Sequence, residues 1–152
     1  RLGAKVYVTS GSDHKLAAAR THGADGGVNY RKDDWTKALI SQIGGRPDVV
    51  IDGAGGDTFN KALDVLKPGG RLVSYGSTTG AAQSVEIRRL FWKQLNVLGT
   101  TMGSPGDFAA MVKLYEGGLR PVIDQVFPLE RASDAHARME AGDQFGKIVL
   151  KM

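Results

Sequence analysis

The chain has 152 residues, of which 41% are hydrophobic and 24% are charged. This is the composition of a globular domain of ordinary size, and it excludes a disordered or fibrous protein. The absence of cysteine excludes disulfides and thiolate-bound metal within the sequence, and no run approaches the ~20 apolar residues needed to cross a membrane. The net charge of +4 favours an anionic ligand. Because Arg88, Arg89 and Lys93 form the one close basic group, we interpret it as a solvated face and expect no nucleic acid or membrane partner.

Residues 1–5 (RLGAK) contain no initiator methionine, and no apolar stretch typical of a signal peptide follows them. They read like the end of a helix entering a strand. We therefore expect the natural protein to begin upstream of this sequence and to be cytoplasmic.

Short apolar runs alternate with helix-forming stretches along the chain. Asp34 and Asp57 are each expected to begin a helix, and Ser104 to Asp107 (SPGD) has the pattern of a capping box with proline at the first helical position. Strands are predicted at residues 4–10, 27–30, 48–52, 71–75, 96–102 and 147–151, with residues 121–127 also extended, and helices at residues 15–21, 35–43, 58–66, 105–115 and 131–141.

This repeated strand–helix pattern predicts an α/β fold with a doubly wound parallel sheet. The run 48–52 (DVVID) is typical of a strand that is buried on both faces. Ligands of such sheets bind beyond the carboxyl ends of the strands. The loops 10–15, 53–57, 76–80 and 100–104 are therefore the candidate binding loops.

The loop 53–58 (GAGGDT) is the nearest approach to the dinucleotide-binding fingerprint Gly-x-Gly-x-x-Gly. It lies between a predicted strand and a predicted helix, but Thr58 stands where the fingerprint has its last glycine. Three interpretations remain open: the main pyrophosphate loop, a second glycine loop where the backbone passes close to a ligand, or a tight turn alone. A methyltransferase-like adenosyl site built on the same glycines is a further, less supported alternative.

The order of motifs resembles the medium-chain dehydrogenases and reductases, in the group of zinc-type alcohol dehydrogenases and quinone oxidoreductases. The resemblance covers essentially the whole chain, from the second strand of the family's nucleotide-binding domain to the carboxyl terminus. The matching stretches are 2–6 (LGAKV), 11–15 (GSDHK), 29–30 (NY), 48–52 (DVVID), 67–73 (KPGGRLV), 98–101 (LGTT), 128–130 (PLE), 135–136 (AH) and 146–150 (GKIVL).

This resemblance implies that the family's glycine-rich loop, its first strand and most of its catalytic domain lie upstream of this chain. Zinc-dependent members take their metal ligands from that region, so zinc is compatible with the parent protein but is not expected to bind here. The histidines His14, His22 and His136 show no ligand spacing, and no catalytic or metal-binding residue is assigned within the chain. In the strand order 3-2-1-4-5-6, the missing first strand is the central one. We therefore expect either direct pairing of strand 4–10 with strand 48–52 or an unpaired edge.

The resemblance places the adenosine end of a nicotinamide cofactor at the loop after strand 4–10. No acidic residue ends this strand, whereas an acid there is typical of NAD-binding folds. Ser10, Ser12 and Lys15 are instead expected to receive a 2′-phosphate, although Ser12 is equally explained as a helix-capping residue and Lys15 as a solvated lysine. Tyr30 resembles the family's tyrosine beside the adenosine phosphate, and a half-buried strand aromatic is the alternative. This pattern favours NADP(H) over NAD(H).

The nicotinamide half of the cofactor is expected at the later loops, again by resemblance. The predicted residues are Gly53, Ala54 and Gly55 at the ribose, backbone groups of Gly76, Ser77, Thr78, Thr100, Thr101 and Met102 at the nicotinamide, and Phe145 closing over it.

We therefore interpret residues 1–121 as an NAD(P)-binding Rossmann domain that lacks its first strand and glycine loop, and residues 122–152 as a return into the catalytic domain. The implied activity is hydride transfer between nicotinamide and a small-molecule substrate, either an alcohol or carbonyl compound or a quinone or enone. A catalytically silent binding or structural module of the same fold is the alternative. A homodimer or higher homo-oligomer is expected through strand 96–102.

Overall fold

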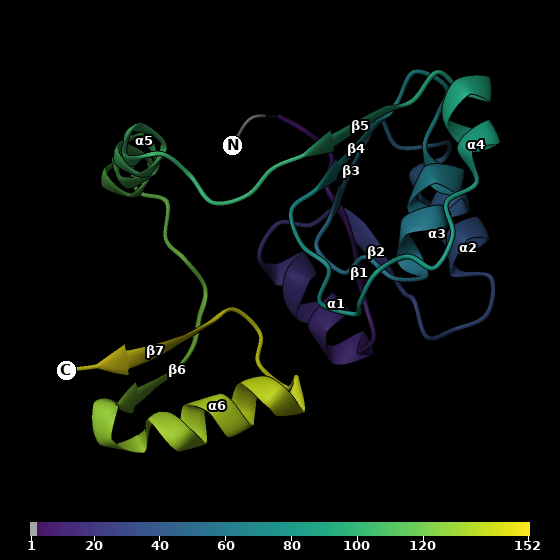
Figure 1. Ribbon diagram of the computed structural model, residues 1–152. Helices are drawn as coiled ribbons and strands as arrows, with labels where there is room; N and C mark the ends of the chain where they lie inside the picture. The colour runs from purple at the N-terminus through teal and green to yellow at the C-terminus, as the bar shows by residue number, and fades with distance from the viewer. Residues whose placement is uncertain (1–2) are drawn as a thin grey trace. The chain divides into compact units, whose positions relative to one another are not determined.

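The computed structural model describes residues 3–152. Arg1 and Leu2 lie outside the described residues, and Leu2 is the first residue of the family-like stretch 2–6. The chain forms two compact units, Arg1–Met102 and Gly103–Met152. The first unit alternates strands and helices as the sequence pattern predicted, except that the helix at Ile87–Trp92 was not predicted (Figure 1). Its elements are β1 (Tyr7–Ser10), α1 (Asp13–Thr21), β2 (Gly26–Asn29), α2 (Trp35–Ile43), β3 (Val49–Asp52), α3 (Thr58–Val65), β4 (Arg71–Ser74), α4 (Ile87–Trp92) and β5 (Asn96–Gly99).

All strand pairs of the first unit are parallel, but they form two sheets. One has the order β1-β2 and the other the order β3-β4-β5. The division falls between β1 and β3, where the strand order of a doubly wound fold places one further central strand. Of the two outcomes expected from the sequence, the structure shows the unpaired edge and not direct pairing of β1 with β3.

The first unit has two small apolar cores. Around α3, the fully buried side chains Leu63, Leu66 and Leu72 pack with Val50 of β3. In the second core, Trp35 and Leu39 of α2 pack on Val28 of β2. Burying a leucine side chain contributes about 1.5–3 kcal/mol, so these contacts are what holds the helices on the sheets.

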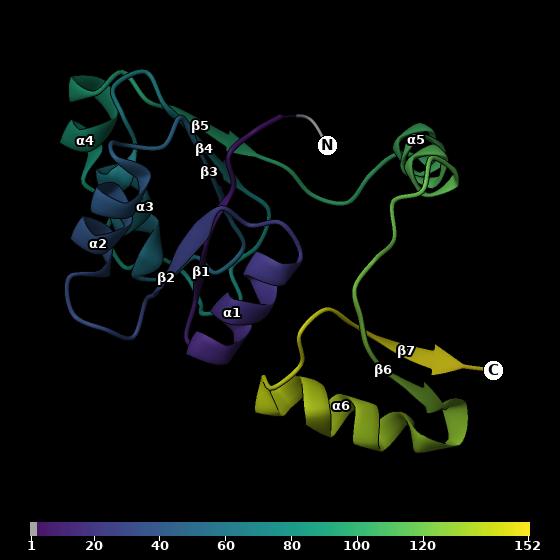
Figure 2. The same ribbon diagram turned by 180° about the vertical axis from the view of Figure 1, so that it is seen from behind.

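The expectation that β3 is buried on both faces is wrong. Val50 packs on the α3 core, and Asp52 on the same side of the strand is buried, but Val49 and Ile51 on the opposite side are 45% and 71% exposed. The reason is visible in Figure 2: the two helices next to the three-stranded sheet, α3 and α4, lie on the same side of it. The continuous apolar run therefore gives this strand one open apolar face.

Side-chain caps form at two of the four helix starts where the sequence offers a capping residue. Ser12 caps α1 by accepting the Lys15 N–H at 3.4 Å, and Ser104 and Asp107 form the predicted capping box. Asp34 stands at the start of α2, as expected, but its side chain does not cap the helix. Its backbone is left-handed, with φ of 50°, and its carboxylate binds Lys37 at 2.8 Å instead of the helix N–H groups. Asp57 likewise begins α3 without a side-chain cap.

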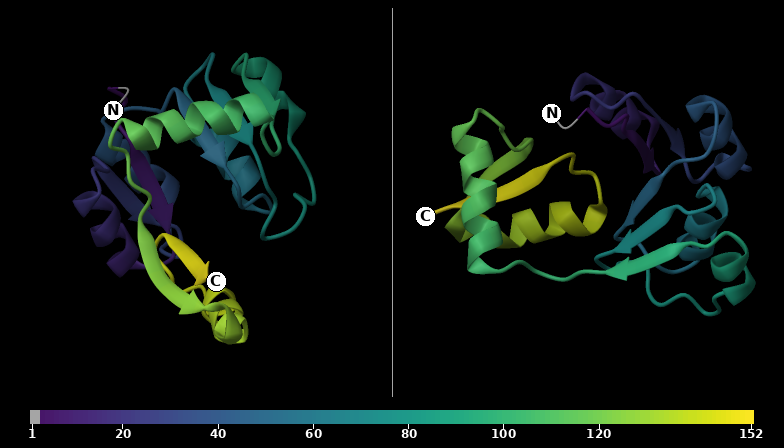
Figure 3. Two further views of the ribbon diagram at one scale, coloured as in Figure 1. Left: turned by 90° about the vertical axis from the view of Figure 1, so that its left-hand side faces the viewer. Right: turned by 90° about the horizontal axis from the view of Figure 1, so that it is seen from above.

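The second unit contains α5 (Pro105–Glu116), β6 (Ile123–Pro128), a 3-10 turn (Leu129–Arg131), α6 (Ala132–Ala141) and β7 (Lys147–Lys151). The strands β6 and β7 are parallel, and α6 connects and covers them (Figure 3). Asp124 of β6 ties the unit together, because its carboxylate accepts hydrogen bonds from Arg138 of α6 and from the backbone N–H of Phe145. No helix in the described part of the chain is long and apolar enough to span a membrane.

Candidate cofactor site

The candidate site lies in the first unit, at the carboxyl ends of its parallel strands. Each strand is followed directly by residues that the sequence singled out: Gly11 and Ser12 after β1, Tyr30 after β2, and the glycine loop 53–56 after β3. The loop that begins with Tyr75 follows β4. Since all these strands are parallel within their sheets, the loops end on the carboxyl edge where such folds bind ligands.

The loop after β1 is held in a fixed conformation by its serines. The Ser10 hydroxyl accepts the Ser12 N–H at 3.2 Å, and the Ser12 hydroxyl accepts the Lys15 N–H. The helix-capping interpretation of Ser12 is thus correct, and it places Lys15 in the first turn of α1. An anion at this helix start would meet both the helix dipole and the lysine charge.

Tyr30 lies directly over Gly11. A Cβ atom built on Gly11 would be 3.0 Å from the Tyr30 hydroxyl and 2.7 Å from Nε of Arg31. Arg31 therefore brings a second cation to the loop that contains Ser10 and Ser12, and it forms no ion pair within residues 3–152. Sequence reasoning missed Arg31, although it directly follows Tyr30.

The acid nearest this loop is neutralised by its neighbours. Asp13 accepts hydrogen bonds from Lys32 at 2.8 Å and from the Asn29 side-chain amide at 2.9 Å. The hydrogen bond from Lys32, followed by that from Asn29, lowers the pKa of the Asp13 carboxyl. The charges beside Gly11 are therefore predominantly positive, which suits a phosphate.

A buried carboxylate shapes the glycine loop after β3. Asp52 is 8% exposed, and its carboxylate accepts the N–H groups of Ala54 at 3.1 Å and of Gly55 at 3.1 Å. Hydrogen bonds from backbone N–H groups to a carboxylate are among the stronger ones in proteins. The sequence showed Asp52 only as the end of an apolar run, so this role was not predicted.

The loops after β3 and β4 are hydrogen-bonded to each other. The N–H of Thr78 donates to the Gly53 carbonyl at 3.2 Å, that of Thr79 to the Ala54 carbonyl at 2.9 Å, and that of Gly56 to the Gly80 carbonyl at 2.8 Å. Ser77 also donates its hydroxyl to the Gly80 carbonyl. Two adjoining loops thus contain Gly53, Ala54 and Gly55, which the resemblance places at the ribose, and Gly76, Ser77 and Thr78, which it places at the nicotinamide.

The remaining predicted residues belong to segments other than these two loops. Thr100 continues the β4–β5 ladder, with its N–H 3.0 Å from the Ser74 carbonyl. Thr101 and Met102 follow it as exposed residues, and Met102 has a left-handed backbone with φ of 54°. Phe145 belongs to the second unit, where its N–H binds Asp124.

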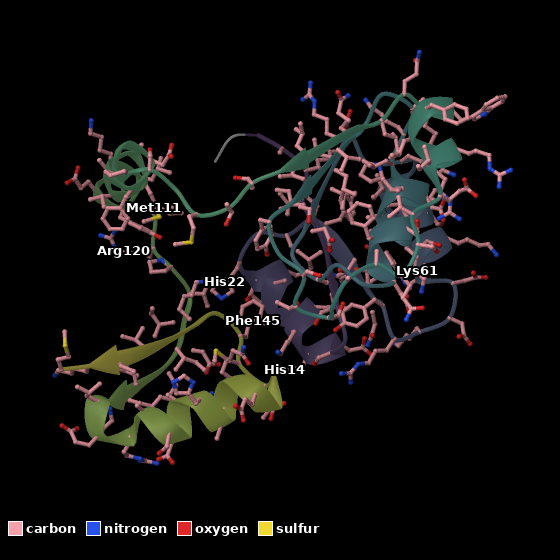
Figure 4. The ribbon with its side chains drawn as sticks, in the orientation of Figure 1. His14, His22, Lys61, Met111, Arg120 and Phe145 are labelled. Carbon is pink, nitrogen blue, oxygen red and sulfur yellow. The ribbon has the colours of Figure 1, made fainter. Side chains whose placement is uncertain are left out.

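Two other features do not carry the site. A cavity of about 450 Å³ lies beside α1 and β2, lined by Leu16, Val28 and Trp35, but none of the predicted cofactor residues borders it. His14 and His22 stand at opposite ends of α1 (Figure 4). Within residues 3–152, no three histidine, aspartate or glutamate side chains lie close enough together to hold a metal ion.

A parallel α/β sheet with glycine loops, cations and a capped helix start at its carboxyl edge defines a Rossmann-like, nucleotide-binding class of fold. The profile of one family, described as zinc-binding dehydrogenase, matches residues 1–117. The chain therefore belongs to the zinc-binding dehydrogenase family.

Known relatives agree with this assignment. The chain is 40% identical to the zinc-type alcohol dehydrogenase-like protein YogA of Leptosphaeria maculans, over 99% of this chain and 45% of that protein. It is 33% identical to quinone oxidoreductase-like protein 2 of Bos taurus, over 99% of this chain and 46% of that protein. The crystal structure of an NAD-dependent alcohol dehydrogenase matches with 37% identity and a TM-score of 0.90, over 99% of this chain and 44% of that one. The chain thus spans less than half the length of these relatives.

Proposed function

We propose that this chain is the cofactor-binding part of an NAD(P)-dependent oxidoreductase. The observation that carries the proposal is the pair of glycine-lined loops at the carboxyl edge, one at Gly11 with cations beside it and one at Gly53 braced by Asp52. Backbone without a Cβ lets a ligand approach closely, and Lys15 and Arg31 supply charge for its phosphate. When bound, the nicotinamide supplies the hydride that passes to or from an alcohol, carbonyl, quinone or enone.

The chain's own residues bind and orient in this proposal. Ser10, Ser12, Lys15, Tyr30 and Arg31 hold the adenosine end, and the loops at Gly53 and Gly76 hold the nicotinamide end. Thr100, Thr101, Met102 and Phe145 are assigned to the nicotinamide end by resemblance. Residues 1–121 then form the nucleotide-binding domain and residues 122–152 return to the catalytic domain. We place the parent protein in the cytoplasm as a homodimer or higher oligomer, with any zinc held by residues outside this chain.

We further propose a preference for NADP(H) over NAD(H). Asp13, the acid that could repel a 2′-phosphate, is engaged by Lys32 and Asn29, while Arg31 lies beside Gly11. A hydrogen bond to a charged group contributes about 1.5–3 kcal/mol, so one such contact gives on the order of tenfold preference.

The test compares kcat/KM for NADPH and NADH in a protein that joins this chain to its catalytic half. Lys15→Ala and Arg31→Ala should each reduce kcat/KM with NADPH about tenfold or more and leave NADH nearly unchanged. Equal losses with both cofactors would show that neither residue binds the 2′-phosphate. Absence of oxidoreductase activity with either cofactor in the wild type would favour the silent-module alternative.

A further inference from the structure

Two glycine–tyrosine pairs occupy equivalent places in the first unit. Ser10 at the end of β1 lies opposite Asn29 of β2, and Asp52 at the end of β3 lies opposite Ser74 of β4. The residue after each first strand is a glycine, and the residue after each second strand is a tyrosine. Gly11 therefore faces Tyr30 just as Gly53 faces Tyr75.

The backbone of the two pairs is the same. The Tyr30 N–H donates to the Ser10 carbonyl at 3.0 Å, and the Tyr75 N–H donates to the Asp52 carbonyl at 3.0 Å. Each bond extends its ladder by one residue and so fixes where the tyrosine begins. This repetition comes from the geometry of parallel strands and would not by itself require an aromatic residue.

The side chains also repeat. A Cβ atom on Gly53 would lie 2.5 Å from Cζ and 2.6 Å from the hydroxyl oxygen of Tyr75. The corresponding distances from Gly11 to Tyr30 are 3.1 and 3.0 Å. In both pairs the hydroxyl end of the tyrosine ring occupies space that a Cβ atom at the glycine would need.

Neither tyrosine is buried by this contact. Tyr30 is 43% exposed and Tyr75 is 61% exposed, so much of each ring is open at the carboxyl edge. The glycine loop against which Tyr75 lies is fixed by the Asp52 carboxylate and by the hydrogen bond from Thr78 to the Gly53 carbonyl. An aromatic ring whose end lies against a fixed loop, and which is otherwise largely exposed, offers a surface for a flat ligand group.

We propose that Tyr75 contacts the nicotinamide ring of the cofactor with its aromatic ring, and that residue 53 is glycine so that the end of this ring can lie against the loop. Tyr75 is then the counterpart, at the nicotinamide end, of Tyr30 at the adenosine end. This inference rests on the proposed function. It adds a residue that determines the shape of the nicotinamide pocket, and it makes Gly53 and Tyr75 one functional unit.

The experiment titrates the 152-residue chain with two half-cofactor probes and follows backbone amide chemical shifts. The probes are reduced nicotinamide mononucleotide and adenosine 2′,5′-bisphosphate. Tyr75→Ala should weaken binding of the nicotinamide probe about tenfold, as removal of an aromatic residue stacked on a base does, and change the adenosine probe less than twofold. Tyr30→Ala, the matched variant, should show the reverse pattern.

Two further variants separate the ring from the hydroxyl and from the backbone. Tyr75→Phe keeps the ring and should bind the nicotinamide probe like the wild type. Gly53→Ala should displace the ring and weaken the same probe, whereas adding Gly53→Ala to Tyr75→Ala should cause little further loss, because the clashing partner is gone. Amide spectra of all variants verify that each is folded.

The outcomes distinguish the two levels of the proposal. If the wild type binds neither probe, the proposed function itself fails, and this inference with it. If both probes bind and Tyr75→Ala leaves the nicotinamide probe unchanged, only the inference is overturned. The inference would also be overturned if Tyr75→Phe weakened binding of the nicotinamide probe as much as Tyr75→Ala does. Additive losses of binding in the Gly53→Ala/Tyr75→Ala double variant would overturn it as well.

Discussion

Lys93 caps the carboxyl end of α3, and its removal tests how much this cap contributes to the stability of the first unit. Its ammonium group donates to the carbonyls of Leu63, Asp64 and Leu66 at 3.0, 2.7 and 3.3 Å. A helix end leaves such carbonyls without intrahelical partners, and the helix dipole favours cations there; the Asp64 carbonyl also accepts a hydrogen bond from Arg46. Because α3 carries the main apolar core, the effect of Lys93→Met should reach the whole first unit.

The magnitude follows from two opposing effects. Hydrogen bonds to a charged group contribute about 1.5–3 kcal/mol in favourable settings. Partial burial, together with the neighbouring charge of Arg46, lowers the pKa of Lys93, which shows that the ammonium is held at some cost. We therefore expect a net loss of ~1–2 kcal/mol in the free energy of unfolding, after discounting for solvent screening.

The assay is urea unfolding followed by tryptophan fluorescence, because Trp35 is 8% exposed and reports on this unit. Lys37→Met is the matched control: it also removes a lysine, but one whose ion pair with Asp34 is fully at the surface. The unfolding midpoint should fall in Lys93→Met and stay within error in Lys37→Met. Equal midpoints for the two variants would refute the capping role of Lys93.

Three other predictions follow from the same structure. Leu63→Ala, at a side chain with 0% exposure, should lower the free energy of unfolding by about 2–5 kcal/mol in the same urea titration. Ile51→Thr, on the open face of β3, should change this free energy by less than about 0.5 kcal/mol. The hydrogen bond from Arg88 lowers the pKa of Glu86 from 4.5 to about 2. Glu86 should therefore stabilise the fold above pH 4.5 and lose this contribution as the pH falls toward 2. Glu86→Gln should flatten that part of the curve of unfolding free energy against pH. Self-association through the free edge of β5 should give dimers or larger oligomers by light scattering in the parent protein, and Leu98→Lys should shift them toward monomer; a wild type that stays monomeric at all concentrations would contradict it.

The sequence predicted the order of strands and helices, apart from the short helix α4, because apolar periodicity, helix-capping residues and glycine positions are local signals. It could not predict which faces would be covered. Ile51 belongs to an apolar run typical of a buried strand, yet it is 71% exposed because α3 and α4 lie on the opposite face. Asp34 has the residue type of a helix cap, yet its left-handed backbone turns its carboxylate toward Lys37.

The candidate site was predictable where the residues share a loop or a family motif, and not where they meet across strands. Ser12 and Lys15 lie on one helix start, so their relation follows from spacing alone. The contacts of Arg31 with Gly11 and of Tyr75 with Gly53 depend on strand register, which a single sequence does not display. The basic group of Arg88, Arg89 and Lys93 is interpreted from the sequence as a solvated face; this holds for the exposed Arg88, whereas Arg89 pairs with Asp64 and Lys93 binds the end of α3.

The central claim is that the carboxyl edge of the first unit binds a nicotinamide cofactor. Amide chemical-shift mapping of the ¹⁵N-labelled chain with NADP⁺ tests it most directly. We expect the adenosine half to shift the amides of Gly11, Ser12 and Tyr30, and the nicotinamide half to shift those of Gly53 and Ser77. The shifts should not be confined to residues that line the cavity beside Leu16 and Trp35. Shifts confined to that cavity, or no saturable shifts at millimolar NADP⁺, would contradict the claim.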